Sequence, residues 1–176
     1  MATAALAEAQ AGAAGRGYVA ARAVHAGELL HAEQPLALAV DPAHAASVCA
    51  WCLAPAAHRC AQCQLLRFCG RGCQRAAWPQ HKPECRALAA LPAARRAVAP
   101  TLLRLAAQVL WSREALAQCL ARLRGHRAAL SEAAKEQLAQ LLFAAREYMG
   151  NIDLPPEALD LLAALVCNTF AVTDAG

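Results

Sequence analysis

Seven cysteines and His81 form four regular pairs within residues 49–85 of this 176-residue chain. In chain order the pairs are Cys49 with Cys52, Cys60 with Cys63, Cys69 with Cys73, and His81 with Cys85. A CxxC turn lets two thiolates reach one ion, and two ligands four residues apart on a helix lie on the same face. Eight ligands suffice for two tetrahedral zinc sites with no position left for a catalytic water. The spacing therefore predicts two structural Zn²⁺ ions.

Reduced core cysteines are the alternative explanation, but such residues have no reason to recur in ligand pairs or to lie among arginines. The chain has nine cysteines, an odd number that suits a pure disulfide framework poorly. The two outside the cluster, Cys119 and Cys167, are expected to be small core residues. Spacing alone leaves open whether the ligand pairs combine sequentially or interleave.

Composition narrows the class of protein. Apolar residues make up 59% of the chain, but much of this is alanine, so leucine, valine and the few aromatic residues must form the core. Residues 1–14 lack the basic and apolar regions of a signal peptide, and we expect them to be flexible. No apolar run approaches the roughly 18–20 residues that cross a bilayer. We therefore expect a soluble intracellular protein without a membrane partner.

Basic residues surround the cysteines. Residues 45–98 contain eight Lys and Arg but a single acid, Glu84, although the whole chain carries a net charge of only +4. Either these side chains solubilise the segment and offset thiolate charge, or they form a docking surface for nucleic acid or an acidic protein segment. No aromatic residues interleave with them for base stacking, so the sequence supports nucleic acid only weakly.

The flanking segments differ in periodicity. Before the cysteines, residues 15–40 predict short strands around a turn at 25–27, with Leu36, Leu38 and Val40 alternating with alanine. After them, leucines at three-to-four spacing predict a helical stretch over 100–123.

Two further helices and a strand are expected towards the end of the chain. Ser131 opens a helix that Gly150-Asn151 stops, with an inner face formed by Leu138, Leu141, Leu142 and Phe143. Pro155-Pro156 starts the next helix. The β-prone residues 166–173 predict a strand that packs with residues 15–40.

The cysteine segment resembles a MYND zinc finger, with C49-x2-C52-x7-C60-x2-C63-x5-C69-x3-C73-x7-H81-x3-C85, "RFC" and "AAWPQHKPEC". That resemblance implies interleaved zinc binding, in which the first and third pairs hold one ion and the second and fourth hold the other. It also implies a protein-interaction module that takes proline-containing peptides.

The chain as a whole resembles the N-terminal part of the SET-and-MYND (SMYD) protein-lysine methyltransferases, and is most similar to the branch of the third human member. "GRGYVAARAVHAGELL" resembles the opening of the split SET domain and "LPPEALDLLAALVCNTFAV" its return. The implied fold is α+β, with a MYND-type double-zinc finger inserted into a split SET β-region. Its parts would be a flexible 1–14, SET strands at 15–45, the finger at 49–85, a helical SET insertion at 86–150, and the start of the SET core at 151–176.

The resemblance also implies a function, the S-adenosylmethionine-dependent methylation of lysines on histones or other proteins, in the cytoplasm and nucleus. Carried over by position, the cofactor would contact Ala14, Gly15, Arg16, His126 and Asn168. His126 is equally well explained as an exposed histidine at a helix end.

The family's catalytic parts are not found in these 176 residues. An Asn-His-Ser-Cys motif, a later tyrosine and a CxC-containing segment with a third zinc would follow, but no histidine occurs after His126 and the only tyrosines are Tyr18 and Tyr148. We therefore expect a piece or truncated product of a methyltransferase, inactive alone and with an incomplete cofactor site. The alternative is a catalytically inactive, zinc-binding protein-interaction module.

Overall fold

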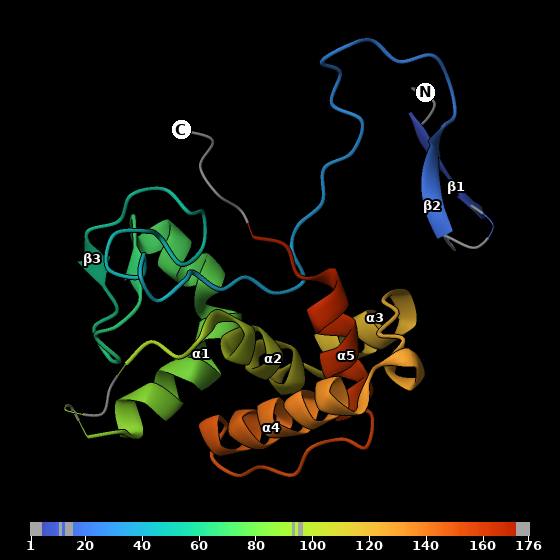
Figure 1. Ribbon diagram of the computed structural model, residues 1–176. Helices are drawn as coiled ribbons and strands as arrows, with labels where there is room; N and C mark the ends of the chain where they lie inside the picture. The colour runs from blue at the N-terminus through green and yellow to red at the C-terminus, as the bar shows by residue number, and fades with distance from the viewer. Residues whose placement is uncertain (1–4, 11, 13–15, 93, 95–96, 172–176) are drawn as a thin grey trace. The chain divides into compact units, whose positions relative to one another are not determined.

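The computed structural model of the protein describes residues 5–10, 12, 16–92, 94 and 97–171. The chain forms two compact units, Met1–Pro35 and Leu36–Gly176. Figure 1 shows a strand hairpin in the first unit, and short strands and α-helices in the second. No helix among the described residues is long and apolar enough to cross a membrane.

An antiparallel hairpin is the regular structure of the first unit. Strand β1 (Leu6–Gln10) pairs with β2 (Arg16–Ala20), so that Leu6 lies opposite Ala20. The predicted flexibility of residues 1–14 is thus wrong at β1, because the β-prone backbone of β2 finds its hydrogen-bonded partner in the preceding segment. Of the strands predicted for residues 15–40, β2 alone occurs in the described part, residues 16–40.

The turn predicted after β2 is confirmed. The backbone N–H of Glu28 donates to the carbonyl of His25 at 3.1 Å, and Gly27 adopts the left-handed conformation with φ +81°. The carboxylate of Glu28 also accepts the backbone N–H of His25 at 3.0 Å and pairs with Arg22. No strand follows the turn at residues 28–30.

Residues 36–40 are not a strand, although their alternation predicts one. Their backbone groups bond instead to side chains of α2 (Thr101–Trp111). The amide of Gln108 accepts from the N–H of Leu38 at 3.2 Å and donates to its carbonyl at 3.0 Å. Arg104 donates to the carbonyl of Val40 at 2.9 Å. Side chains of a helix thus satisfy the groups that a neighbouring strand would otherwise have paired.

The cysteine-rich segment contains two very short strands and a long helix. Strand β3 (His58–Arg59) pairs antiparallel with β4 (Arg67–Phe68), and α1 (Arg71–Ala90) follows.

The predicted helical stretch over 100–123 is two helices. After α2 the chain turns at Ser112 and continues as α3 (Arg113–Arg122). Ser112 has a ψ of 109°, outside the helical region, and its hydroxyl oxygen accepts the backbone N–H of Ala115 at 3.1 Å. This is N-capping by serine, which starts a new helix at a position where leucine periodicity alone gives no sign of a break.

The helix predicted at Ser131 is confirmed as α4 (Glu132–Tyr148), which follows the short 3₁₀ helix η3 (Arg127–Ala129). Ser131 caps α4 by accepting the N–H of Ala134 at 3.2 Å. Gly150 and Asn151, at φ +84° and +60°, take the left-handed conformations that stop a helix.

The last helix, α5 (Ala158–Asn168), begins after the predicted proline pair. The strand predicted from residue 166 is wrong at Val166–Asn168, which are helical. Residues 172 and 173 of that predicted strand lie outside the described residues. Packing of α5 against the other helices has overridden the local β-propensity of this segment.

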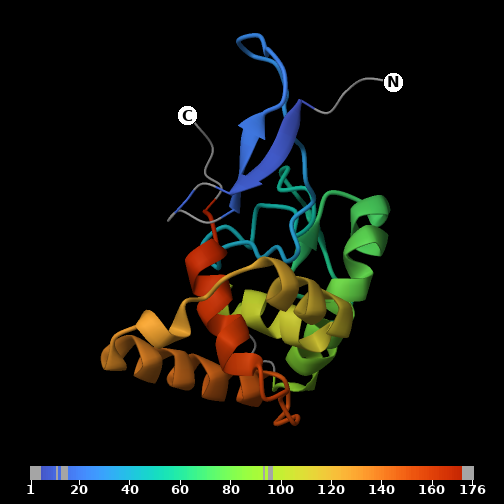
Figure 2. The same ribbon diagram turned by 90° about the vertical axis from the view of Figure 1, so that its right-hand side faces the viewer.

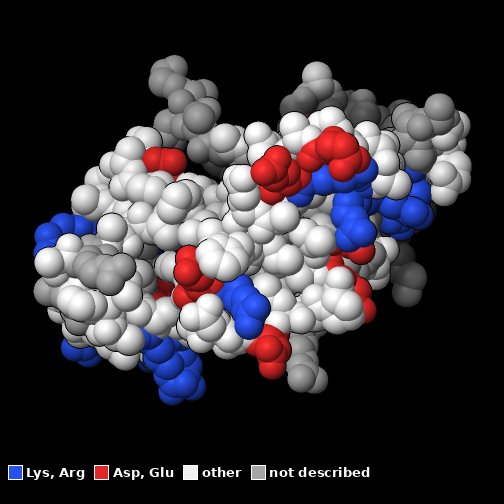
Figure 3. All heavy atoms as spheres, turned by 60° about the horizontal axis from the view of Figure 1, so that its bottom comes forward, with Lys and Arg blue, Asp and Glu red and all other residues white. Residues whose placement is uncertain are grey.

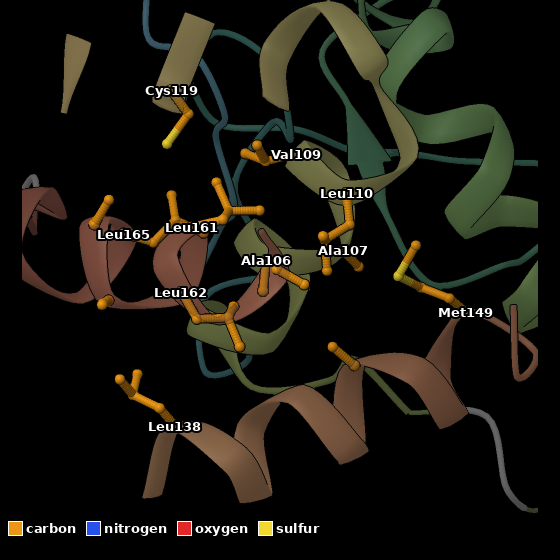
Figure 4. Close-up of a cluster of buried hydrophobic side chains, with 14 residues drawn as sticks. Ala106, Ala107, Val109, Leu110, Cys119, Leu138, Met149, Leu161, Leu162 and Leu165 are labelled. Carbon is orange, nitrogen blue, oxygen red and sulfur yellow. The ribbon is translucent and has the colours of Figure 1, made fainter. Parts of the chain in front are cut away.

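Helix α2 is the centre of the helical region, in contact with α1, α3, α4 and α5. Figures 1 and 2 show it lying among them from both directions. The core between α2, α4 and α5 is apolar, and Figure 4 shows Leu138 of α4 and Leu162 of α5 on facing sides of their helices. Leu138 is buried as predicted, whereas Phe143 is 64% exposed and does not belong to the inner face.

The chain between α3 and η3 lies unusually close to α5. A Cβ atom placed on Gly125 would lie 2.5 Å from the backbone nitrogen of Ala164 and 2.7 Å from the Cβ of Ala163. Only glycine permits this approach, because the nearest neighbours include the backbone of a packed helix.

Gly125→Ala is expected to lower the free energy of unfolding by about 1–3 kcal/mol, since α5 must move away. Gly72→Ala is the matched control, because nothing lies within 4 Å of the added methyl group, and it should change stability by less than about 1 kcal/mol. Chemical denaturation of the zinc-loaded protein measures both. Equal stability of the two variants would contradict the close approach.

Candidate metal centre

The structure gathers the eight predicted ligands into two groups, each with its ligand atoms within 4.8 Å of one another. The first cluster is Cys49, Cys52, Cys69 and Cys73, and the second cluster is Cys60, Cys63, His81 and Cys85. The interleaved arrangement that the MYND resemblance implied is confirmed. The second cluster is buried throughout, whereas Cys52 and Cys69 of the first are exposed.

The distances within both clusters suit tetrahedral zinc. With bonds of about 2.3 Å, a tetrahedral ion holds its sulfur ligands about 3.8 Å apart. In the first cluster the Sγ of Cys69 lies 3.6 Å from that of Cys52 and 3.3 Å from that of Cys73. These separations exceed the length of a disulfide bond, and all nine cysteines are free. Thiolates and one imidazole are the ligands zinc prefers, so the residues fit the metal.

The two CxxC turns close in the same way. The backbone N–H of Leu53 donates to the carbonyl of Cys49 at 3.1 Å, and that of Gln64 donates to Cys60 at 3.0 Å. Leu53 and Gln64, each just after the second cysteine of its pair, have φ near +64° and +63°. Residues other than glycine seldom adopt this conformation. The turns thus hold an uncommon backbone shape that points both thiols of a pair at one place.

Helix α1 carries the later ligands on its buried side. Ala77, His81, Glu84, Cys85 and Leu88 are its buried residues, and their spacing of four, three, one and three places them on one face. The helix continues through Pro79 and Pro83, although interior prolines remove backbone hydrogen bonds. Packing of this face therefore stabilises α1 where its backbone does not.

The thiols of each cluster differ in acidity. Burial opposes ionisation of Cys63, but a hydrogen bond with His81 lowers the pKa of Cys63 to about 6. Burial, then the neighbouring Cys60, raise the pKa of Cys85 to about 12. One thiolate therefore forms readily while its neighbours resist a second negative charge. A bound dication would remove that repulsion, since it stabilises several thiolates together.

The first cluster repeats this pattern. Burial opposes ionisation of Cys49, yet the backbone N–H groups of Cys52 and Cys69 lower its pKa to about 7. Hydrogen bonding to Cys69 raises the pKa of Cys73 to about 12. Both clusters are therefore electrostatically arranged for a cation.

The sequence analysis did not predict the buried charged residues that lie next to the second cluster. Glu84 and Arg104 are buried charges, 1% and 2% exposed, and they pair with each other. Glu84 also contacts His81 and Tyr148. A signal for one of them existed, because Glu84 is the only acidic residue between Asp41 and Glu114.

The residues predicted to contact a cofactor are only partly brought together. Ala14 and Gly15 lie outside the described residues, and Arg16 is in β2 of the first unit. His126 is exposed at the start of η3 with φ +47°. The side-chain amide of Asn168 donates to the carbonyl of Ala164 at 2.7 Å and to that of Arg124 at 3.3 Å, two residues before His126.

The two remaining cysteines differ. Cys119 is fully buried in the helical core, as predicted. Cys167 is exposed, which corrects its expected core position, and its thiol contacts the carbonyl of Gly125 at 3.8 Å.

The basic residues of α1 face the solvent. Arg71, Arg75, Lys82 and Arg86 are exposed, and Trp78 between them is 37% exposed. Figure 3 shows a different character on the face that carries α4, where acidic and basic side chains are interspersed on a largely uncharged surface.

Comparison with known proteins agrees with this geometry. Residues 49–85 match the MYND finger family. Human histone-lysine N-methyltransferase SMYD3 is 29% identical over 177 residues, covering 92% of this chain and 41% of SMYD3. Human histone-lysine N-methyltransferase SMYD1 is 34% identical over 100 residues, covering 55% of this chain and 19% of its own length. SET domain and MYND-type zinc finger protein 6 of Schizosaccharomyces pombe is 36% identical over 78 residues, covering 43% of this chain and 16% of its own length.

Two interleaved Cys/His clusters, in a segment that matches the MYND finger family, identify residues 49–85 as a MYND-type finger. The wider similarity extends well beyond the finger, to 92% of the chain. Over most of its length the chain is therefore similar to lysine methyltransferases of the SMYD family. It spans about two fifths of the length of SMYD3.

Proposed function

We propose that this chain supplies the zinc finger and one wall of the methyl-donor site of a protein-lysine methyltransferase. The observation that carries the proposal is the similarity over 92% of the chain to a relative named as a histone-lysine N-methyltransferase. The two Cys/His clusters would each hold a structural zinc ion. Histones and other lysine-bearing proteins are the proposed substrates, and the nucleus and cytoplasm the proposed location.

S-adenosylmethionine, when bound, supplies an electrophilic methyl group for transfer to a lysine amine. Ala14, Gly15, Arg16, His126 and Asn168 are the residues proposed to contact it. Asn168 supports this role because its amide already ties the end of α5 to the segment that precedes His126.

A hybrid protein tests this proposal, with residues 1–176 replacing the matching region of human SMYD3. The hybrid should bind S-adenosylmethionine and methylate a histone substrate. Asn168→Ala in the hybrid should weaken cofactor binding by about 1–3 kcal/mol, through loss of a polar contact. Gln118→Ala, a change at an exposed position of α3, is the control and should have no effect. Undiminished cofactor affinity in both Asn168→Ala and His126→Ala would contradict the site.

A second candidate is a protein-interaction module without catalysis. It is favoured by the finger itself, whose eight ligands and small core all lie within one compact unit. The partner would be a proline-containing peptide. Calorimetry of the zinc-loaded chain with such a peptide, together with an inactive hybrid, would support this function over the first.

A further inference from the structure

Glu84 occupies an unusual position for a carboxylate. It is the only acidic residue between Asp41 and Glu114, in a region rich in arginine. Solvation of surface charge does not explain it, because its side chain is 1% exposed and turned inward from α1. A carboxylate is buried at this depth only where other groups stabilise its charge.

Two helices of the second unit supply those groups. From α2, the Nε of Arg104 donates to Oε1 of Glu84 at 2.5 Å, and its second terminal nitrogen donates to Oε2 at 3.2 Å. From the end of α4, the hydroxyl of Tyr148 donates to Oε1 at 2.9 Å. Arg104 also donates to the carbonyl of Val40. The finger's helix α1 is therefore joined at one carboxylate to α2, to α4 and to the segment before the finger.

The same carboxylate faces the second cluster. The Nε2 of His81 lies 3.7 Å from the Sγ of Cys63, which makes Nε2 the ligand atom. Its other nitrogen, Nδ1, lies 3.6 Å from Oε2 of Glu84. Nδ1 is the one buried side-chain nitrogen or oxygen in the described part of the chain that has no hydrogen-bond partner. A histidine that ligates through Nε2 carries its proton on Nδ1, and it needs an acceptor there.

We propose that Glu84 is the outer partner of the second zinc site, and that through Arg104 and Tyr148 it couples zinc binding there to the packing of α2 and α4. The inference rests on the proposed zinc binding. Glu84 holds His81 with Nε2 directed at the thiols, and it is itself held by the two helices. Glu84 is a positioning residue, since it acts through His81.

The first cluster provides an internal comparison. Two of its ligands, Cys52 and Cys69, are exposed, and it contains no histidine that requires an orienting partner. The coupling should therefore belong to the second site alone. This asymmetry separates the proposal from a general dependence of zinc binding on stability.

Competition with a chromophoric chelator, titrated into the zinc-loaded 176-residue chain, tests the role of Glu84. Glu84→Gln should lower the affinity of one of the two zinc sites by about 10- to 100-fold and leave the affinity of the other site unchanged. Leu88→Ala is the matched control, because Leu88 is 2% exposed on the same face of α1 but belongs only to the apolar core. The positioning role is overturned if Leu88→Ala lowers the zinc affinity of one site as much as Glu84→Gln does. It is also overturned if Glu84→Gln leaves both zinc affinities unchanged.

If Glu84→Gln does not fold, Tyr148→Phe tests the same proposal, because this substitution removes only one hydroxyl group. It should lower the zinc affinity of the same site by a smaller factor. Tyr18→Phe, in the separate hairpin unit, should change the affinity of neither site. Unchanged affinity in Tyr148→Phe would overturn the link to α4.

Hydrogen exchange tests the coupling to the helices. Cys60→Ser, which damages the second site, should lower amide protection in Thr101–Trp111 and Glu132–Tyr148. Cys52→Ser, which damages the first site, should leave both helices protected. Equal protection in the two variants would overturn the coupling, even where the wild-type chain still binds two zinc ions. A wild-type chain that binds no zinc would instead overturn the zinc proposal itself.

Discussion

Removal of zinc from the reduced protein should unfold the segment of residues 49–85. Four of the eight buried residues of its small core are themselves ligands, namely Cys49, Cys60, Cys63 and Cys85. Little apolar surface therefore remains to hold the segment without metal, and structural zinc contributes roughly 10–16 kcal/mol of apparent binding free energy in such modules. This is the largest effect expected for the protein.

Metal analysis and circular dichroism measure this outcome. The wild-type chain should hold two zinc ions, and Cys69→Ser should lose the ion of the first cluster. Cys119→Ser is the control, because Cys119 is buried in the helical core outside both clusters. Retention of both ions by Cys69→Ser, or of the finger's fold after complete chelation, would contradict the assignment.

Arg104→Met should lower the free energy of unfolding by about 3–5 kcal/mol, because it leaves the charge of Glu84 buried without its main partner. Burial opposes that charge, but His81 and then Arg104 hold the pKa of Glu84 at about 2 in the intact protein. The double variant Arg104→Met/Glu84→Gln removes the unpaired charge and should recover part of the loss.

Arg127→Met is the matched control for this prediction. Arg127 also pairs with a carboxylate, that of Asp160 at 3.4 Å, but both side chains are about half exposed. Exposed pairs contribute about 0–1 kcal/mol, so this variant should be nearly as stable as wild type. Urea denaturation of the zinc-loaded chains compares the variants, and similar losses for Arg104→Met and Arg127→Met would show that the buried pair has no special role.

Local features of the fold could be predicted from the sequence where short-range chemistry decides them. Ser131 and Gly150-Asn151 bound α4 as expected, because a capping hydroxyl and left-handed residues act within one helical turn. Ser112 has the same capping chemistry but was missed, since it lies inside an unbroken leucine pattern.

Features that depend on distant partners were predicted less well. The alternation at residues 36–40 describes an apolar segment correctly, but its backbone pairs with Gln108 and Arg104 rather than with a strand. The β-prone residues at Val166–Asn168 became the end of α5. In both cases tertiary packing overrode the local preference.

The ligand pairs themselves were readable from the sequence, because two ligands of one pair are only three or four residues apart. Their spacing did not decide how the pairs combine; the family resemblance implied interleaving, and the tertiary structure has it. The cluster of Glu84, Arg104 and Tyr148 was decided by tertiary structure alone. Arg104 and Tyr148 follow Glu84 by 20 and 64 residues in the chain. No local periodicity relates side chains at such separations, and only the packing of α1, α2 and α4 brings them together.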